Sequence, residues 1–286
     1  MQGPSTHGVK HGTWPLASTE NVSHWWPHGL EVATVVHFII YVALGGIFGF
    51  VGGLFGIGGA FLAIPILGIF AGLNEQTAQG TALSMALPNV VVGLWSYSRK
   101  ARLDWRLAAT LAFAALPSAY VAARIATLLP SAPLRIAFSI FLVVVALDLA
   151  RRTFFKQPPA IAALPWPFAA VVGVAGGAFS GFFGIGGAIA TVPAMAILFA
   201  LRQVEAQGMS LAFAVPTTIL TTATYAMASD VDWAIGIPLA IGGVLTVSAG
   251  VAVAHRLPER ALRSLFIGFI VVVAIALFLK ARATGA

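Results

Sequence analysis

The chain contains no cysteine, and only 9% of its 286 residues are charged. The lack of cysteine excludes disulfide bonds, thiolate catalysis and cysteine-based metal sites. Water-soluble domains carry about 25% charged residues, so the shortage of charge excludes an ordinary soluble domain. Because 59% of the residues are hydrophobic, the composition predicts a polytopic membrane protein.

The formal net charge is +7, but the basic residues form no stripe interleaved with aromatic side chains. A nucleic-acid partner is therefore not expected. Lys and Arg gather instead in short loops between apolar segments. That pattern is typical of the cytoplasmic loops of membrane proteins.

Residues 1–32 are polar and lack the basic start, apolar middle and cleavage site of a signal peptide. A metal site needs ligands held in a fixed geometry, whereas the histidines of this segment are irregularly spaced. These histidines are His7, His11, His24 and His28. We therefore predict a disordered tail, with neither a metal site nor another cofactor.

Apolar segments follow the tail, near residues 33–55, 60–73, 77–98, 106–128, 134–150, 165–183, 188–201, 206–228, 234–254 and 262–279. The segments 60–73 and 188–201 hold only 14 residues each. A helix of that length extends roughly 21 Å, which is less than the roughly 30 Å core of a bilayer. Each short segment follows a glycine-rich octet, GLFGIGGA at 53–60 or GFFGIGGA at 181–188.

The two octets belong to an internal repeat with a constant offset of 128 residues, as from Gly56 to Gly184. The same offset relates Pro65 to Pro193, Gln79 to Gln207, Gly80 to Gly208, Pro88 to Pro216, Tyr97 to Tyr225, Asp104 to Asp232, Trp105 to Trp233, Pro130 to Pro258 and Arg135 to Arg263. Such a pattern predicts a tandem duplication. We expect a first transmembrane repeat at 33–156 and a second at 157–286, which together form one transport domain.

Each half contains five apolar segments, and an odd number forces the second half to enter the membrane from the opposite side. The loop charges agree, because RKARLDWR at 99–106 is basic whereas MASDVDWA at 227–234 carries only aspartates. If the basic loops are cytoplasmic, both termini are periplasmic. The predicted fold class is an all-α, multi-pass inner-membrane protein with two inverted repeats, whose glycine-broken or re-entrant helices meet centrally.

Unwound backbone is tolerated in a membrane only where protein or a water-filled cavity covers it. Each octet ends where a short helix should begin, and a helix N-terminus suits an anion. We therefore predict two opposed anion sites formed by Gly56, Gly58, Gly59, Gly184, Gly186 and Gly187. The alternative is helix packing, the role that we assign to the glycines spaced four apart, Gly45, Gly49, Gly53, Gly173, Gly177 and Gly181.

Some polar side chains lie inside the apolar segments, and neutral donors can bind a small oxyanion without trapping it. We take Gln79, Asn89, Gln207 and Thr217 as candidate ligands. The alternative is that such groups bond across helices or to their own helix carbonyls, as we expect for Thr221, Thr222 and Thr224. No carboxylate lies clearly at the membrane centre, which argues against a cation transporter.

The motifs GLFGIGGAFLAIPIL and GFFGIGGAIATVPAMAIL, followed by AQGTALS and AQGMSLA, resemble the TauE/SafE family of sulfite exporters. The resemblance covers roughly residues 35–280. It implies an inner-membrane transporter that exports sulfite or an organosulfonate such as sulfoacetate. The family's glycine loops correspond to residues 55–60 and 183–188.

The family's Ala-Gln-Gly signature corresponds to residues 78–80 and 206–208 of this chain. Met209 follows the second signature where Thr81 follows the first. The two half-sites are therefore not expected to be equivalent.

We predict an exporter of a small sulfur-containing anion, bound at the paired half-helix N-termini near the membrane midplane. A transporter or channel for another small anion, such as a carboxylate or another oxyanion, is the alternative. An intramembrane enzyme is less favoured, since His37 and His255 have no evident partner for catalysis; we predict no catalytic residue. The expected partners are the anion and membrane lipid, and a homodimer is left open.

Overall fold

A computed structural model describes residues 28–154, 164–186 and 188–258, together with a few separate residues between 261 and 268. The described residues are helical, with no strand among them. By its contacts the chain divides into a unit of residues 1–37 and a unit of residues 38–286. Of the first unit only the opening turns of a helix are described, and all the packing below lies in the second.

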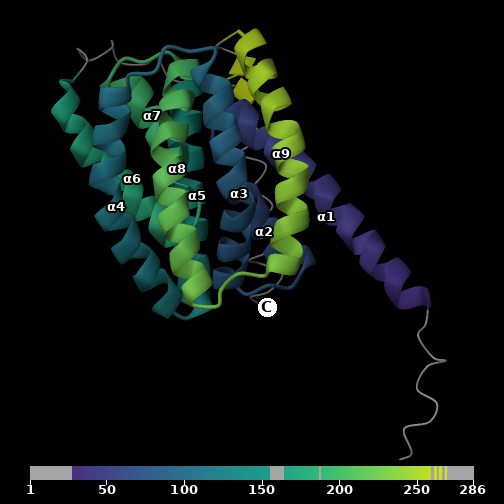
Figure 1. The fold of residues 1–286 in the computed structure, drawn as a ribbon. Helices are drawn as coiled ribbons and strands as arrows, with labels where there is room; N and C mark the ends of the chain where they lie inside the picture. The colour runs from purple at the N-terminus through teal and green to yellow at the C-terminus, as the bar shows by residue number, and fades with distance from the viewer. Residues whose placement is uncertain are drawn as a thin grey trace, which may run out of the picture. The chain divides into compact units, whose positions relative to one another are not determined.

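In each half, a helix that ends at a glycine octet is followed by a short helix and then by longer helices (Figure 1). The helical elements are α1 (His28–Phe55), α2 (Ala60–Phe70), α3 (Glu75–Ser98), α4 (Trp105–Leu128), α5 (Ser131–Phe154), the 3₁₀ turn η1 (Trp166–Phe168), α6 (Ala169–Phe183), α7 (Ala188–Leu198), α8 (Gln203–Met227) and α9 (Trp233–Arg256). Residues 1–27 of the predicted tail and most of the tenth apolar segment lie outside the described residues. The prediction is wrong for residues 28–32, which form the start of α1. The all-α class is confirmed.

Within the described part of the chain, four helical stretches are long and apolar enough to cross a bilayer. These are Val35–Phe55, Trp105–Leu128, Trp166–Phe183 and Trp233–Arg256. The helices α2 and α7 have 11 residues each, which is shorter than predicted and extends about 17 Å. Each short helix is therefore too short to cross the roughly 30 Å core of a bilayer by itself.

The helices α4 and α9 begin in the same way, as the repeat predicts. The carboxylate of Asp104 accepts hydrogen bonds from the N–H groups of the second and third residues of α4, at 3.0 and 3.1 Å. Asp232 does the same for α9, at 3.0 and 3.2 Å. These are N-caps that satisfy otherwise unpaired helix donors. In the loop before α9, partial burial raises the pKa of Asp230.

Two pairs of neighbouring helices pack backbone against backbone at the glycines spaced four apart. A Cβ on Gly45, in α1, would lie 2.1 Å from the carbonyl oxygen of Leu239 in α9. At the equivalent position, a Cβ on Gly173 in α6 would lie 2.4 Å from the carbonyl oxygen of Leu111 in α4. The packing role assigned to these glycines is confirmed, because no larger residue fits the contacts.

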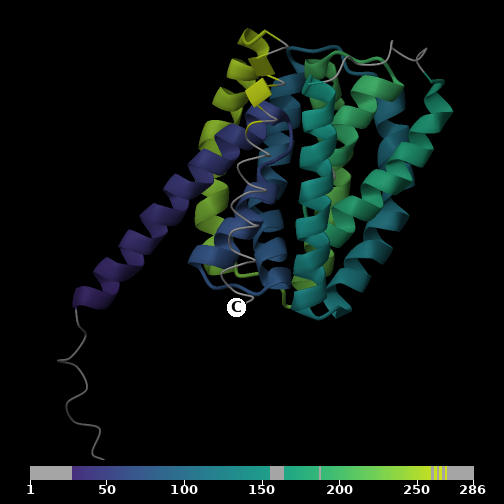
Figure 2. The same ribbon diagram turned by 180° about the vertical axis from the view of Figure 1, so that it is seen from behind.

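The helices α3 and α8 form an antiparallel pair that joins the two halves, and they lie side by side in Figure 1 and Figure 2. Near one end of the pair the hydroxyl of Tyr97 lies 2.9 Å from the side-chain oxygen of Gln207. Near the other end the hydroxyl of Tyr225 lies 2.7 Å from the side-chain oxygen of Gln79. The two tyrosines are equivalent in the repeat, and so are the two glutamines. Each contact joins a tyrosine of one half to the glutamine of the other, as a two-fold arrangement requires.

The basic loops lie near the end of α3, and the acidic loop lies near its start. The ring of Tyr97, near the end of α3, lies 5.0 Å from the ring of His255 near the end of α9, so the basic loops 99–106 and 255–258 share one end. At the start of α3, the hydroxyl of Thr81 accepts a hydrogen bond from the N–H of Asp232 at 2.9 Å.

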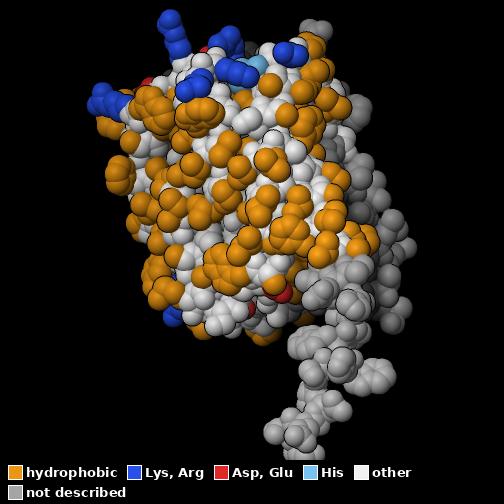
Figure 3. Space-filling model, turned by 45° about the vertical axis from the view of Figure 1, so that its right-hand side comes forward, with side chains coloured by type: hydrophobic (Ala, Val, Ile, Leu, Met, Phe, Trp, Pro, Cys, Tyr) orange, Lys and Arg blue, Asp and Glu red, His pale blue; other side chains and the backbone are white. Residues whose placement is uncertain are grey.

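Figure 3 shows most of the Lys and Arg side chains at one end of the helices and hydrophobic side chains over the flank of this face. The basic and acidic loops therefore lie at opposite ends, as the inverted repeat predicts. The orientation of the two halves in a bilayer stays a prediction.

Candidate anion site

The first octet is a break between α1 and α2 that only glycine can make without strain. Gly56, Gly58 and Gly59 have φ angles of +67°, +71° and +86°, which side chains rarely tolerate. The break is closed on one side by a hydrogen bond of 2.9 Å from the N–H of Ile57 to the carbonyl of Gly52. Gly59 is the N-cap of α2 and contributes no side-chain cap, so the start of the short helix keeps its positive end.

The second octet breaks the chain between α6 and α7 in a related but different way. Gly184 and Gly186 have φ angles of +63° and +69°, and Gly187 lies outside the described residues. Here the N–H of Gly184 donates to the carbonyl of Ser180 at 3.0 Å. The predicted break is therefore present in both halves, but the two breaks are closed by different hydrogen bonds.

Each octet packs on the glutamine of the opposite repeat. A Cβ on Gly56 would lie 2.7 Å from the Cβ of Gln207, and a Cβ on Gly184 would lie 2.9 Å from the Cβ of Gln79. Both glutamines are fully buried. The structure thus brings together candidate residues that lie far apart in the sequence, in two crossed pairs.

Two buried tyrosines hold these glutamines in place. The hydroxyl of Tyr97 lies 3.0 Å from the carbonyl of Gly53 as well as contacting Gln207. The hydroxyl of Tyr225 lies 3.4 Å from the carbonyl of Gly181 as well as contacting Gln79. A hydroxyl has one proton, so each tyrosine shares it between the glutamine and the last turn of the broken helix.

The amide nitrogen of each glutamine also contacts one protein oxygen. Gln79 donates to the carboxylate of Glu75 at 3.2 Å, and Gln207 lies 3.4 Å from the carbonyl of Leu54. Their role as direct anion ligands stays a prediction. What the contacts establish is that both side chains tie the end of one broken helix to the other half.

The antiparallel pair places its two prolines at the same level. Pro88 lies midway between the two contact points on α3, and Pro216 lies midway between those on α8. A proline inside a helix removes one hydrogen bond and bends the helix. The middle of the pair is therefore its least regular part.

Both breaks reach this middle level. A Cβ on Gly58 would lie 2.5 Å from the side chain of Val90, and a Cβ on Gly186 would lie 3.2 Å from the hydroxyl oxygen of Thr218. Val90 and Thr218 each lie two positions beyond the proline of their helix, which is about 3 Å of helix rise. Because the two helices are antiparallel, Val90 and Thr218 lie on opposite sides of the level of the prolines, so the breaks contact the helix pair about 6 Å apart along its length.

Asn89 is fully buried between the first break, at Gly58, and Gly243 of α9. Its amide nitrogen is 3.5 Å from the carbonyl of Gly58, and its side-chain oxygen has no hydrogen-bond partner among the described residues. Thr217, the other candidate on a helix face, is satisfied within α8, where its hydroxyl lies 3.1 Å from the carbonyls of Phe213 and Ala214. The structure therefore brings Asn89, and not Thr217, to a glycine break with an unpaired polar atom.

The hydroxyls that we expected to bond across helices or to their own helix carbonyls divide into two kinds. That expectation is confirmed for Thr224, which donates to the carbonyl of Leu220 at 2.8 Å. It is wrong for Thr221 and Thr222, whose buried hydroxyls have no partner among the described residues. The sequence shows that these residues are polar, but not which way they face.

The TauE/SafE sulfite exporter family model matches residues 41–277 of the chain. The chain belongs to the TauE/SafE family. The match spans both octets and both glutamines, so the resemblance drawn from those motifs is confirmed. With several apolar helices, this TauE/SafE member is a multi-pass membrane transporter.

Relatives of this TauE/SafE protein carry the same general description. It is 29% identical over 228 residues to a probable membrane transporter protein of Xylella fastidiosa, covering 78% of this chain and 87% of the relative. It is 25% identical over 249 residues to the probable membrane transporter protein YunE of Bacillus subtilis, covering 78% and 90%.

A probable membrane transporter protein of Methanocaldococcus jannaschii is 28% identical over 174 residues, covering 59% and 65%. No solved structure matches the chain. The family and these names indicate a membrane transporter rather than an enzyme.

The charged groups of the described residues lie away from the middle of the helix pair. Glu75, at the start of α3, is the buried carboxylate closest to a candidate residue, and it lies 3.8 Å from the guanidinium of Arg135. Among the described residues no three His, Asp or Glu side chains group as metal ligands. The level at which the breaks meet is therefore lined by neutral groups, which is unfavourable for a cation.

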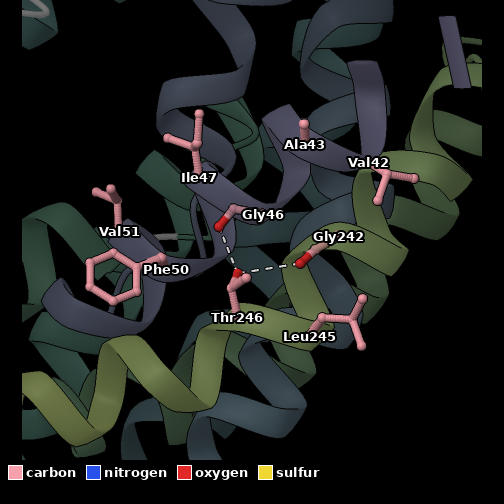
Figure 4. A pocket seen from close by; sticks show the side chains of 9 residues that line it. All are labelled: Val42, Ala43, Gly46, Ile47, Phe50, Val51, Gly242, Leu245 and Thr246. Atoms are coloured by element: carbon pink, nitrogen blue, oxygen red, sulfur yellow. Dashed lines mark hydrogen bonds between the residues drawn. The ribbon is translucent and has the colours of Figure 1, made fainter. Parts of the chain in front are cut away.

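A separate apolar pocket of about 490 Å³ lies between α1 and α9 (Figure 4). Its only hydroxyl, that of Thr246, donates to the carbonyl of Gly46 at 2.6 Å and also faces Gly242. None of the ten candidate site residues lines it. An apolar pocket without a free donor suits hydrocarbon rather than an anion, so it is not the candidate site.

Buried polar residues at the breaks that were not predicted as site residues include Tyr97, Tyr225, Ser180 and Thr218. The signal for the tyrosines was available, because they are identical at the repeat offset. Ser180 gave no such signal, since its equivalent in the first half is Gly52.

Proposed function

We propose that this TauE/SafE transporter moves a small sulfur-containing anion, sulfite or an organosulfonate such as sulfoacetate, across the inner membrane. The observation that carries the proposal is the pair of glycine breaks at the middle of α3 and α8. Each break opens a short helix whose N-terminus favours negative charge. The surrounding side chains are neutral, so an anion is not opposed by carboxylates.

In this proposal the anion is bound by the backbone N–H groups of the two breaks, with Asn89 beside the first. Gln79 and Gln207 contribute from the opposite halves, where their packing sets the shape of each break. The basic loops face the cytoplasm, so both termini are periplasmic. The export direction is proposed from the likeness to the sulfite exporter family. The two repeats act as one transport domain.

The second candidate is a transporter of a different small anion, such as a carboxylate. It is favoured because the described site residues include no Lys or Arg, whose positive charge would select a doubly charged oxyanion. A substrate panel separates the two candidates. Purified protein is reconstituted in vesicles, and flux is measured for sulfite, sulfate, thiosulfate, sulfoacetate, taurine and acetate.

Saturable sulfite or sulfoacetate flux that exceeds acetate flux supports the sulfur-anion proposal. Acetate transported in preference to every sulfur compound would instead establish the second candidate. Flux of none of the six, by protein that retains a cooperative thermal transition, would overturn both.

Gly58→Ala is expected to reduce substrate flux by at least about tenfold, which corresponds to about 1.4 kcal/mol. Gly58 has a φ of +71°, and a Cβ there would lie 2.5 Å from Val90. Gly72→Ala is the matched control, because Gly72 has a φ of +65° but open space around it. Both variants carry the same backbone strain of about 1–2 kcal/mol.

The strain is expected to lower the melting temperature of both variants, whereas only Gly58→Ala is expected to lose flux. Equal flux in the two variants would show that the first break plays no part in transport.

A further inference from the structure

Four buried hydroxyls of the described residues have no hydrogen-bond partner. They are those of Ser180, Thr218, Thr221 and Thr222. A buried polar group without a partner is costly, so such groups are rare and call for an explanation. All four lie in the second repeat, on α6 and α8.

Thr218 lies beside the second glycine break, and Thr221 and Thr222 follow it along the same side of α8. The hydroxyl oxygen of Thr218 is 3.2 Å from the position that a Cβ on Gly186 would occupy. Two turns later on the same face, the hydroxyl of Tyr225 lies 3.4 Å from the carbonyl of Gly181. Residues three, four and seven positions apart share a helix face, so Thr221 and Thr222 lie between these two contacts.

Ser180 adds a hydroxyl at the end of α6, one turn before Gly184. It is fully buried. Its backbone carbonyl already accepts the hydrogen bond that closes the break, but its side chain is unpaired. The second break is therefore bordered by unpaired hydroxyls from both the helix that ends there and the helix that packs on it.

The first break has no counterpart of this group. At the repeat offset, the equivalents of the four hydroxyl residues are Gly52, Val90, Gly93 and Leu94. A Cβ on Gly52 would lie 2.5 Å from the N atom of Gly59. The first break therefore has no room for a side chain at the position that Ser180 occupies in the second half. The duplicated halves thus differ in donor chemistry at their otherwise matching breaks.

We propose that the second break is the principal binding site, where the hydroxyl of Thr218 donates a hydrogen bond to an oxyanion. Ser180, Thr221 and Thr222 supply further donors. This inference rests on the proposed function, since it assigns the anion to one of the two breaks. The ligand class is a small anion with several oxygens, because a compact oxyanion accepts hydrogen bonds from several hydroxyls at once.

Hydroxyl oxygens can also bind a cation, but the charges at the second break favour an anion. The positive end of α7 points into the break. The carboxylate of Glu75 is separated from it by Gln79 and Tyr225 and lies 3.8 Å from Arg135. A bound anion would accept hydrogen bonds from the unpaired hydroxyls, and the positive end of α7 would offset part of its charge.

The test compares Thr218→Val with Thr224→Val in the purified full-length transporter. Both changes replace a buried threonine of α8 by a residue of the same shape, but the hydroxyl of Thr224 is bonded to its own helix. Sulfite binding is measured by calorimetric titration. We expect Thr218→Val to weaken sulfite binding roughly tenfold, as for the loss of a hydrogen bond to a charged group, and Thr224→Val to change it less than about twofold.

Thermal unfolding without ligand gives an independent measurement. Thr218→Val removes an unpaired buried hydroxyl, so it is expected to melt at the same temperature as the wild type or higher. The stabilisation that sulfite confers should shrink at the same time. A higher melting temperature together with weaker binding distinguishes a binding residue from one that only supports the fold.

Unchanged sulfite affinity in Thr218→Val, with wild-type binding intact, would overturn this inference and leave the proposed function standing. A wild type that binds none of the panel anions would overturn both. Stabilisation of the wild type by sodium ions in a chloride medium, lost in Thr218→Val while sulfite affinity is retained, would identify a cation site and overturn the inference.

Discussion

Alanine at Gly45 is expected to destabilise the transporter by about 3 kcal/mol, the upper end of the cost of overpacking. Gly45 lies where α1 meets α9, and a Cβ there would be 2.1 Å from the carbonyl oxygen of Leu239. Because the atom in the way is backbone, no side-chain rotation can relieve the clash. The helices must move apart, and the loss is measured as a lower melting temperature in detergent.

The adjacent glycine provides the control. A Cβ on Gly46 would lie 3.5 Å from the Cγ2 of Thr246, which is an ordinary contact. Alanine favours a helix over glycine by about 1 kcal/mol, so Gly46→Ala should be neutral or slightly stabilising. Equal melting temperatures for Gly45→Ala and Gly46→Ala would contradict the close packing of α1 on α9.

Gln207→Ala is expected to cost about 2–3 kcal/mol, since it leaves a cavity and removes a partner from two buried groups. Its side chain lies 2.9 Å from the Tyr97 hydroxyl and 3.4 Å from the carbonyl of Leu54. The same change loosens the first break, because Gly56 packs on this glutamine. Chemical or thermal unfolding of the purified variants measures the loss.

A double-mutant cycle identifies the contact responsible. Gln207→Ala and Tyr97→Phe remove the two sides of one hydrogen bond, so their combined effect should differ from the sum by about 1 kcal/mol or more. Tyr225→Phe is the matched control, because Tyr225 contacts Gln79 instead. Its cycle with Gln207→Ala should be additive within about 0.5 kcal/mol. Equal coupling in the two cycles would contradict the crossed pairing.

The repeat made much of the fold predictable. Ten apolar segments, two octets and a constant offset were enough to predict broken helices and their partners in the chain. The short helices α2 and α7 begin where the octets end, at Ala60 and Ala188. They end sooner than the apolar runs do, because hydropathy does not distinguish the last helical turn from the apolar loop that follows it.

The sequence predicted the glycines and glutamines that meet at the breaks, but not which of the other polar side chains lie there with an unpaired atom. Asn89 and Thr217 were equivalent candidates, since each follows a proline at the repeat offset. The structure gives Asn89 an unpaired oxygen beside Gly58 and gives Thr217 two carbonyls of its own helix. A hydroxyl in a helix can turn towards the backbone or away from it, and only the packing around it decides between the two.

By itself, the sequence determined that the protein is an all-helical membrane transporter, that its helices break at the octets, and that it is duplicated. Composition, glycine conformation and the repeat offset are properties of the chain and need no tertiary contact. The tertiary structure alone decided that each break packs on the glutamine of the other half. It also decided that unpaired hydroxyls gather at only one break. Both depend on which face a side chain presents across the antiparallel pair of α3 and α8, and residues far apart in the sequence fix that geometry together.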